Sequence, residues 1–271
     1  MLIYGSRMYF KTNLVRSFGE CEHCGRYGRH VSYRARKFGH IYFIPLIPLG
    51  SHAQVLRECK SCSMGSHIPT HQLDPMIDNL SDQFKSWIME ISDGKTEIEI
   101  EPGQPPANIG LLITGILDDL YCLNEIQDVT SITNVLDANN LVYERHLVMG
   151  RWFEIQGDLD QARLAFQAAA NARPTEGPAH YQLGLIEILR GDVPAAEAAF
   201  TRYLQIHPED HSPHMELLGL YEVQNDYAKL VPCFDVLFER IPELLDQKKL
   251  KKLYKKALKK SGLQGKFSTQ V

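Results

Sequence analysis

The first quarter of the chain alternates polar and apolar side chains as β-strands do, and the rest repeats apolar side chains at helical spacing. His30–Arg36 alternates large and polar side chains, and Phe38–Ile47 is rich in aromatic and branched residues. Gly50-Ser51 interrupts this pattern before a short strand predicted at Ala53–Arg57. Alternation with a period of two, bounded by turn residues, is typical of strands. We therefore expect a small β-rich domain over residues 1–70.

A single amphipathic helix is predicted next. Asp74-Pro75 is typical of an N-cap followed by proline at the first helical position. Apolar side chains then recur at spacings of one, three and four residues as far as Gly94: Met76, Ile77, Leu80, Phe84, Trp87, Ile88 and Ile91. Thr96–Glu101 is predicted to be a short exposed strand, and Pro102–Pro106 marks a hinge. Residues 71–106 are thus predicted to form a helix and a linker.

A period of 34 residues organises the following segment. The matched positions are Gly150 and Gly184, Gly157 and Gly191, Asp158 and Asp192, Ala162 and Ala196, then Phe166, Phe200 and Phe234, and Pro174, Pro208 and Pro242. Asn225-Asp226 stands where Gly-Asp occurs twice before. Small residues permit close helix contact, the phenylalanines fill the space between paired helices, and each proline ends a second helix.

These positions resemble the tetratricopeptide repeat (TPR) family, whose period is 34 residues. The resemblance implies three helix pairs, at 143–176, 177–210 and 211–244, stacked as a solenoid. The third pair has Leu218 where a small residue is expected, which predicts a more open pair. The first helices of such repeats line a concave groove, and five positions of this chain are predicted to contact a partner there: Arg151, Tyr181, Leu185, Ile188 and Met215. The apolar and acidic character of the groove favours a hydrophobic or basic segment.

Two flanking segments complete the predicted helical array. Residues 107–142 contain two helical patterns, Gly110–Cys122 and Ile126–Ala138, which form either a degenerate repeat or a cap. Residues 245–263 form a lysine-rich helix whose apolar stripe suits it to cover the open end of the array. That stripe consists of Leu250, Leu253, Tyr254, Ala257 and Leu258. A solvated cap is the simpler interpretation, and binding to an acidic protein, an anionic lipid or nucleic acid is the alternative.

Charge is strongly segregated although the whole chain carries only −4. Residues 1–70 carry ten basic and three acidic side chains, a net charge of +7. Residues 71–247 carry −20, and residues 248–271 carry +9 with no acidic side chain. Such segregation predicts separate units with separate surfaces. A basic first domain raises nucleic acid as a target, but basic side chains that only offset the charge of zinc-bound thiolates are the favoured interpretation.

Four of the six cysteines form two C-x-x-C pairs, Cys21 with Cys24 and Cys59 with Cys62, separated by 34 residues of strand-like sequence. Each pair lets two sulfurs of one tight turn face the same ion, and Gly25 can take the positive φ that the turn needs. Four thiolates suit one structural zinc ion and leave no open coordination position. Redox-active pairs, iron in place of zinc, or a histidine ligand (His23, His40 or His67) are the alternatives.

Together with Met1–Gly5 and the run Ile41–Gly50, these two cysteine pairs resemble the zinc-ribbon family found at the N-terminus of many uncharacterised proteins. The resemblance supports Cys21, Cys24, Cys59 and Cys62 as zinc ligands and implies no activity. The expected fold class is therefore α+β and multidomain, with a small β-rich zinc ribbon followed by an all-α TPR solenoid.

The function expected from these motifs is a non-enzymatic, zinc-binding adaptor that binds a protein or peptide through the ribbon and the groove. Nucleic-acid binding by the basic ribbon and the lysine-rich helix is the alternative. No phosphate loop, G-x-S-x-G or H-E-x-x-H motif indicates an enzyme or a small-molecule substrate. Asp118-Asp119 is a paired carboxylate, but we expect it to be solvated on a helix surface. The apolar runs are too short for a transmembrane segment and no signal peptide is visible, so a cytoplasmic protein is expected.

Overall fold

The computed structural model describes residues 4–25, 27–41, 44–99, 105–126 and 128–270. The chain forms two compact units, Met1–Arg173 and Pro174–Val271. The break lies near the end of the first predicted repeat. The finer domain boundaries expected from the sequence remain predictions.

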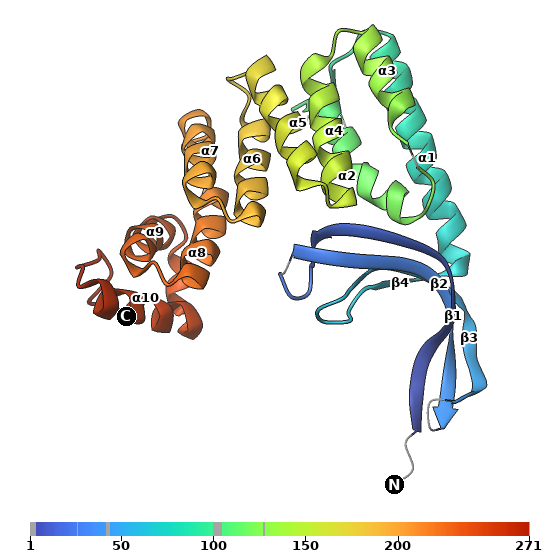
Figure 1. The fold of residues 1–271 in the computed structure, drawn as a ribbon, viewed down its shortest axis with the longest axis horizontal. Helices are drawn as coiled ribbons and strands as arrows, with labels where there is room; N and C mark the ends of the chain where they lie inside the picture. The colour runs from blue at the N-terminus through green and yellow to red at the C-terminus, as the bar shows by residue number, and fades with distance from the viewer. Residues whose placement is uncertain (1–3, 26, 42–43, 100–104, 127, 271) are drawn as a thin grey trace. The chain divides into compact units, whose positions relative to one another are not determined.

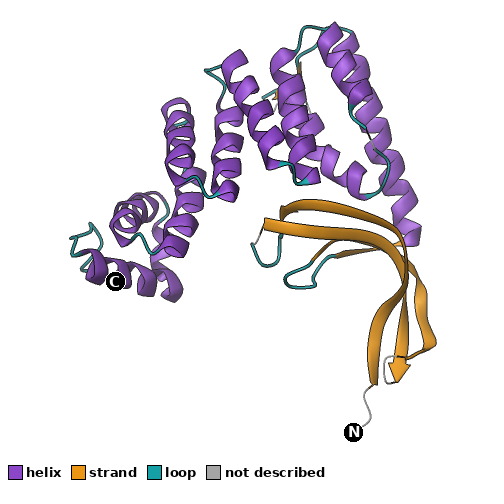
Figure 2. Cartoon of the chain, viewed as in Figure 1, coloured by secondary structure: helices purple, strands orange, loops and turns teal. Residues whose placement is uncertain are grey.

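The first unit begins with an antiparallel sheet of four strands in the order β1-β2-β3-β4 (Figures 1 and 2). The strands are β1 (Tyr4–Glu20), β2 (Tyr27–Ile41), β3 (Ile44–Cys59) and β4 (Ser66–Pro69). The predicted strand His30–Arg36 lies within β2, and Ala53–Arg57 lies in β3. The predicted strand Phe38–Ile47 is divided between the end of β2 and the start of β3, and residues 42–43 lie outside the described residues. Strand β1 was not predicted. Its pairing with β2 is irregular between Tyr9 and Thr12 and between Thr12 and Val15.

Five helices and a second, two-stranded sheet follow in the first unit. The helices are α1 (Thr70–Ser92), α2 (Ile109–Cys122), α3 (Thr130–Ala138), α4 (Val142–Gln156) and α5 (Leu159–Ala172). The two-stranded sheet, formed by β5 (Glu97–Ile98) and β6 (Ala107–Asn108), lies between α1 and α2 in the sequence. Their shared core includes Trp87, Ile113, Leu136 and Val148. The sheet is joined to these helices, because β1 contacts α2 and α4, and β3 contacts α1.

Two predictions for the linker region need correction. Helix α1 begins at Thr70 after Pro69, not at Asp74-Pro75, and Pro75 lies inside it. Pro75 lies in the second turn, where it removes one backbone hydrogen bond of the helix. The strand predicted to be exposed is shorter than expected, and Ile98 within it is buried. Most of the predicted hinge Pro102–Pro106 lies outside the described residues.

The second unit consists of two helix pairs and a terminal helix. The pairs are α6 (Gly177–Arg190) with α7 (Val193–Ile206), and α8 (Ser212–Gln224) with α9 (Tyr227–Arg240). A 3₁₀ turn η1 (Pro242–Asp246) leads to α10 (Lys248–Ser261), whose Leu253, Tyr254 and Ala257 are buried against the core around Phe234. Helices α8 and α9 share a smaller contact than α6 and α7, as Leu218 in place of a small residue predicted.

The turn inside each 34-residue repeat has the same construction. Gly157, Gly191 and Asn225 end the first helices in left-handed backbone conformations, with φ of 82°, 79° and 57°. The aspartate that follows each of them caps the second helix by accepting a backbone N–H bond, from Gln161, Ala195 and Lys229 respectively. Glycine and asparagine adopt this conformation at the least cost, and aspartate is a preferred N-cap. The predicted Gly-Asp and Asn-Asp turns are therefore confirmed.

Close helix contact within a pair depends on the predicted small residues. A Cβ placed on Gly184 would lie 2.6 Å from Cδ1 of Phe200, which is far inside van der Waals contact. We expect Gly184→Ala to destabilise the protein by about 1–3 kcal/mol, because the Phe200 ring must leave its packed position. Gly219→Ala is the matched control, since nothing lies within 4 Å of a Cβ there. The control should be neutral or stabilise by up to about 1 kcal/mol in urea unfolding followed by circular dichroism. Equal effects of both substitutions would contradict this packing.

Candidate metal centre

The four cysteines meet at one end of the sheet. Cys21 directly follows β1, and Cys59 is the last residue of β3. Strand β2 lies between these strands, and His30 pairs with Cys59 across the sheet. The two turns that contain the C-x-x-C pairs are therefore brought together by strand pairing, although 34 residues separate them in the sequence.

Both cysteine turns have the same backbone geometry. The N–H of Gly25 donates to the carbonyl of Cys21 at 2.8 Å, and the N–H of Ser63 donates to that of Cys59 at 2.8 Å. The residue after each second cysteine is left-handed, with φ of 63° at Gly25 and 58° at Ser63. The positive φ predicted for Gly25 is confirmed. In the second turn a serine takes this conformation, at a cost of about 1–2 kcal/mol relative to glycine.

The sulfur atoms lie at distances that fit a metal ion. Sγ of Cys21 is 3.7 Å from Sγ of Cys62, and Sγ of Cys24 is 3.9 Å from Sγ of Cys59. All four sulfurs lie within 4.8 Å of one another. A tetrahedron with metal–sulfur bonds of about 2.3 Å has edges of about 3.8 Å. The four cysteines therefore lie close enough together to hold one metal ion.

The surroundings favour the thiolate form of Cys59 but not that of Cys62. Cys21 and Cys59 are buried, whereas Cys24 and Cys62 are partly exposed. Backbone N–H donors, first that of Cys62 and then that of Ser61, lower the pKa of the Cys59 thiol to about 6. The Ser61 N–H lies 3.3 Å from the Cys59 sulfur. Hydrogen bonds to a thiolate stabilise its charged form, which is the form that binds metal. The Met64 backbone N–H lowers the pKa of the Cys62 thiol, but burial and the neighbouring cysteine sulfurs outweigh it and raise that pKa to about 11.

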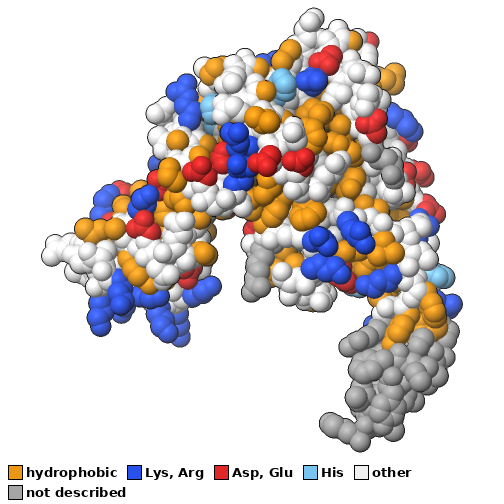
Figure 3. Space-filling model, viewed as in Figure 1, with side chains coloured by type: hydrophobic (Ala, Val, Ile, Leu, Met, Phe, Trp, Pro, Cys, Tyr) orange, Lys and Arg blue, Asp and Glu red, His pale blue; other side chains and the backbone are white. Residues whose placement is uncertain are grey.

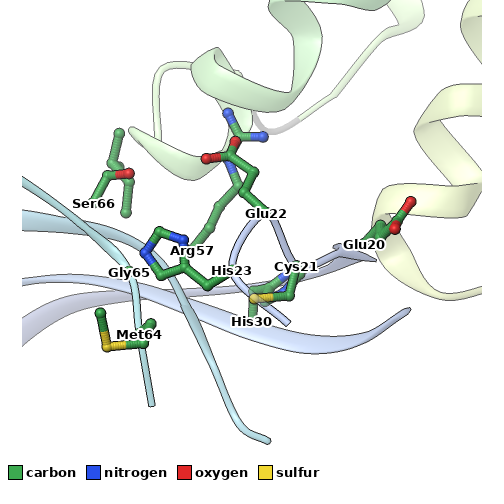
Figure 4. Close-up of a pocket in the computed structure, with 10 residues that line it drawn as sticks. Glu20, Cys21, Glu22, His23, His30, Arg57, Met64, Gly65 and Ser66 are labelled. Atoms are coloured by element: carbon green, nitrogen blue, oxygen red, sulfur yellow. The ribbon is translucent and has the colours of Figure 1, made fainter. Parts of the chain in front are cut away.

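Two of the three histidines considered as alternative ligands, His23 and His67, are not part of the cluster. Within the part of the chain that the structure describes, the group close enough to share an ion contains the four cysteines and neither His23 nor His67. The side chain of His40 lies outside the described residues. His23 instead lines a cleft of about 60 Å³ beside Cys21, together with Glu22, His30 and Met64 (Figure 4). A cleft of this volume has room for a few water molecules.

An ion-pair network attaches this end of the sheet to the helices. Arg57, two residues before Cys59, pairs with Asp118 and Asp119 of α2, and in Figure 4 its side chain extends toward that helix. Burial alone would lower the pKa of Arg57, but the surrounding negative charges, first that of Asp119, together outweigh burial and raise that pKa. The expectation that Asp118-Asp119 is solvated was wrong, because both carboxylates are paired and partly buried.

Helix α4 joins the same network. Arg151 pairs with Asp118 and with Glu154, the latter at 2.7 Å. The hydroxyl of Tyr27, on β2, donates to the backbone carbonyl of Glu154 at 3.2 Å. Arg151, predicted to contact a partner in the groove, thus lies in an internal network of the first unit. Sequence reasoning missed this network because its members are distant along the chain and follow no periodic pattern.

The other predicted contact residues lie in the second unit, on α6 and α8. Tyr181 is partly buried, with its ring centroid 5.2 Å from that of Tyr203 and 5.7 Å from that of Phe200. Burial raises the pKa of the Tyr181 hydroxyl. Leu185 and Ile188 are also partly buried, and Met215 is 40% exposed. These four side chains lie on neighbouring helices and offer a partly apolar surface.

No protein-family model matches this chain, and no curated protein matches it. What the site can do therefore rests on its geometry. That geometry shows a β-sheet whose four clustered cysteines can bind a metal ion, followed by a helical region. Among the described helices, none has both the length and the apolar character needed to cross a bilayer.

Proposed function

We propose that the four cysteines hold one structural zinc ion in a zinc-ribbon domain. The fit of the sulfur distances to a zinc–thiolate tetrahedron supports this proposal. Four thiolates complete the coordination of zinc, so the ion stabilises the sheet and takes no part in catalysis. Metal analysis of the purified protein tests the identity of the ion: one equivalent of zinc is expected. A visible thiolate-to-iron absorption band with one equivalent of iron would contradict it.

Reactivity with a thiol reagent should distinguish the four cysteines of the metal cluster from Cys122 and Cys233. Cys122 and Cys233 are buried, and burial raises the pKa of the Cys233 thiol to about 12. Burial also raises the pKa of Cys122. We expect no rapid reaction of the folded, zinc-loaded protein with a thiol reagent at neutral pH, because thiolate is the reactive form. Removal of zinc by a chelator should make four thiols reactive, and denaturation should make all six reactive. Rapid reaction of all four cluster cysteines before chelation would contradict the zinc site.

We further propose that the protein is a non-enzymatic adaptor whose helices act as tetratricopeptide repeats. The observation that carries this proposal is the identical turn, a left-handed residue followed by an aspartate cap, at positions 34 residues apart. Stacked repeats of this kind present their first helices to a partner. The six free cysteines suit a reducing compartment such as the cytoplasm.

The proposed partner is a protein segment that combines apolar and basic side chains. Within the second unit, Tyr181, Ile188 and Met215 supply apolar surface on α6 and α8. Glu222, also on α8, is exposed and adds negative charge. Complementary charge and partly exposed aromatic surface are features of peptide-binding helical grooves.

A photo-cross-linking amino acid placed at Met215 tests the adaptor proposal in cells. The matched control is the same probe at Val223, which is 81% exposed on the same helix. A protein cross-linked from position 215 but not from 223, and released by Ile188→Glu, is expected. Absence of any adduct at 215, together with catalytic turnover by the purified chain, would overturn it.

Nucleic-acid binding is the second candidate, and one observation favours it. Seven lysines of α10 are exposed while Leu253, Tyr254 and Ala257 are buried, so one side of the helix is strongly basic. Figure 3 shows the corresponding blue cluster at the C-terminal end of the chain. Such a surface predicts salt-dependent binding to phosphate. Retention of RNA or DNA at low salt that Lys255→Glu/Lys256→Glu abolishes would support this function, and no retention would remove it.

A further inference from the structure

The sheet face that the helices cover near the cysteines continues as an uncovered surface. Near the cysteines, Leu56 of β3 belongs to one buried cluster with Leu73 of α1 and Cys122 of α2. Farther along, β1, β2 and β3 extend beyond these helices (Figure 1). Side chains of a strand alternate between its two faces, so Gln54 lies on the same face as Leu56. Arg34 of β2 pairs with Gln54 across the sheet, shares this face and is exposed.

Two rows of paired residues cross the uncovered part of this face. One row joins Tyr9, Arg36 and His52, and the other joins Thr12, Arg34 and Gln54. Residues that are paired across an antiparallel sheet have their side chains on the same face. The two rows therefore offer rings, hydrogen-bonding groups and positive charge, and they contain no aliphatic side chain.

An irregularity in β1 adds a second aromatic ring beside Tyr9. Phe10 follows Tyr9 directly and would face the opposite side of a regular strand. The pairing with β2 shifts between Tyr9 and Thr12, and Phe10 has a left-handed φ of 57°. A bulge of this kind re-aims a side chain. The ring centroid of Phe38 accordingly lies 5.3 Å from that of Phe10 and 6.2 Å from that of Tyr9.

Cationic groups adjoin these rings. The guanidinium of Arg36 lies 5.9 Å from the Phe38 ring. Arg34, in the next row, is exposed. We name Tyr9, Phe10, Arg34, Arg36 and Phe38 the basic-aromatic face.

The Phe10 ring is exposed to water although its backbone is strained. A left-handed conformation is an outlier for a bulky residue, and such strain is concentrated at ligand-binding and other functional positions. The ring remains 66% exposed, so burial within this chain does not offset the strain. A ligand that stacks on the ring would offset it.

The charge of this part of the sheet indicates an anionic ligand. Residues 4–19 and 27–57 contain neither aspartate nor glutamate. Glu58 pairs with Val31 and lies on the opposite face, where its carboxylate accepts from the Tyr33 hydroxyl and from Lys11. Lys11 is therefore occupied on that opposite face and contributes nothing to the basic-aromatic face. The arginines of the basic-aromatic face have no such carboxylate near them in the sequence.

The combination of exposed rings and guanidinium groups favours a single strand of nucleic acid over other polyanions. Unpaired bases stack on exposed aromatic rings, and the phosphates between them bind arginine. The boundary of a lipid bilayer takes up aliphatic as well as aromatic side chains, and the two paired rows contain no aliphatic one. An acidic peptide would bind the guanidinium groups and leave the Phe10 ring unused. A duplex keeps its bases stacked on one another, so they cannot stack on this ring.

We propose that the basic-aromatic face binds single-stranded nucleic acid, with one base stacked on Phe10 and a phosphate bound by Arg34. This binding does not depend on the adaptor function. It also uses a different surface from the lysines of α10, which would bind phosphate without stacking on a base.

Fluorescence anisotropy with the full-length, zinc-loaded protein tests the proposal. The probes are labelled oligouridylate and oligodeoxythymidylate of about 12 nucleotides, and binding of at least one of them is expected. A duplex of the same length should compete poorly. Inorganic polyphosphate is the probe for charge alone, because it carries phosphates and no bases.

Phe10→Asn is the decisive variant, because asparagine tolerates a positive φ and the sheet should remain folded. It should weaken binding of the oligonucleotide by about 5- to 150-fold, the effect of losing one base–ring stack. No charge is removed, so the slope of log affinity against log salt should stay unchanged, as should binding of polyphosphate. Phe10→Trp should retain binding, because indole also stacks on bases.

Arg34→Gln should give the complementary result. Loss of one phosphate contact should reduce the salt slope by about 0.7 for a single strand. It should also weaken binding of polyphosphate, which Phe10→Asn leaves unchanged. The two substitutions thus separate the contribution of stacking from that of charge.

Matched controls assign the binding to this face. Leu164→Ser removes an apolar side chain that is 52% exposed on α5, and it should leave oligonucleotide binding unchanged. In the Lys255→Gln/Lys256→Gln background on α10, Phe10→Asn should weaken binding by the same factor as in the parent protein. The proposal is overturned if neither oligonucleotide binds at low salt, or if binding is lost in the α10 variant and kept in Phe10→Asn. It is equally overturned if Phe10→Asn weakens binding to phosphatidylserine vesicles or to polyglutamate and leaves oligonucleotide binding intact.

Discussion

Replacement of Cys59 by serine is expected to abolish stoichiometric metal binding and to unfold the cysteine end of the sheet. Cys59 is almost fully buried, with 2% exposed, and it belongs to both the metal cluster and the last position of β3. The free energy of metal binding is about 10–16 kcal/mol for structural zinc sites of small domains, and it becomes folding free energy. A serine oxygen replaces the thiolate poorly, because zinc in closed sites prefers sulfur.

Two measurements report the result. The amount of bound metal should fall from one equivalent per chain to well below one. The near-ultraviolet circular dichroism spectrum should lose the contribution of the folded sheet. Cys233→Ser is the control, because Cys233 is buried in the second unit and donates to the His214 carbonyl, as a serine hydroxyl can. The control should retain the metal. A Cys59→Ser protein that still binds one equivalent tightly would show that this cysteine is not a ligand.

The extent of unfolding in the Cys59→Ser variant should differ between the two units. The helical signal at 222 nm should persist for the second unit, Pro174–Val271, which forms a compact unit of its own. Helices α2 and α4 touch β1, α2 forms the ion pairs with Arg57, and Arg151 of α4 pairs with Asp118. Both helices should therefore lose stability with the sheet. Calorimetry should therefore show one transition that moves and one that stays. Loss of all helical signal in a single transition would mean that the chain unfolds as one domain.

Local patterns predicted the features that depend on neighbours in the sequence. The two C-x-x-C pairs and Gly25 indicated the cysteine turns, because the geometry of a tight turn is set by a few adjacent residues. The 34-residue period predicted the turns at Gly157, Gly191 and Asn225 for the same reason. Each of these signals combines a spacing with a side chain or backbone freedom that the spacing requires.

Features that depend on distant partners were not predictable from one sequence. Strand β1 escaped notice because the left-handed residues Phe10 and Asn13 break its alternation. Asp118 looked like a solvated carboxylate because its partners, Arg57 and Arg151, lie 61 and 33 residues away. The first helix was placed too late because Asp74-Pro75 matches a helix start locally, whereas the end of β4 fixes the start at Thr70.

The buried ion pair between Glu144 and Arg173 should be the costliest one to break in the first unit. Glu144 of α4 has no exposed side-chain surface. Its carboxylate accepts from Nη1 of Arg173 at 2.7 Å and from Nδ2 of Asn108 at 3.0 Å. The Oδ1 atom of Asn108 in turn caps α2 by accepting from the Gly110 N–H at 3.0 Å. One buried carboxylate therefore connects the start of α2, the first turn of α4 and the end of α5.

Arg173→Met should destabilise the protein by about 3–5 kcal/mol, because it leaves the Glu144 carboxylate buried without its cation. The double variant Glu144→Gln/Arg173→Met should recover a large part of this loss, since a neutral amide needs no counter-charge and can still bond with Asn108. Lys85→Met provides the contrast: its pair with Asp82 leaves both side chains more than two-thirds exposed, and loss of such a pair costs about 0–1 kcal/mol. Urea unfolding of the four proteins at neutral pH measures these differences. If Arg173→Met and Lys85→Met cost the same, water solvates Glu144, and the buried pair does not hold the three helices together.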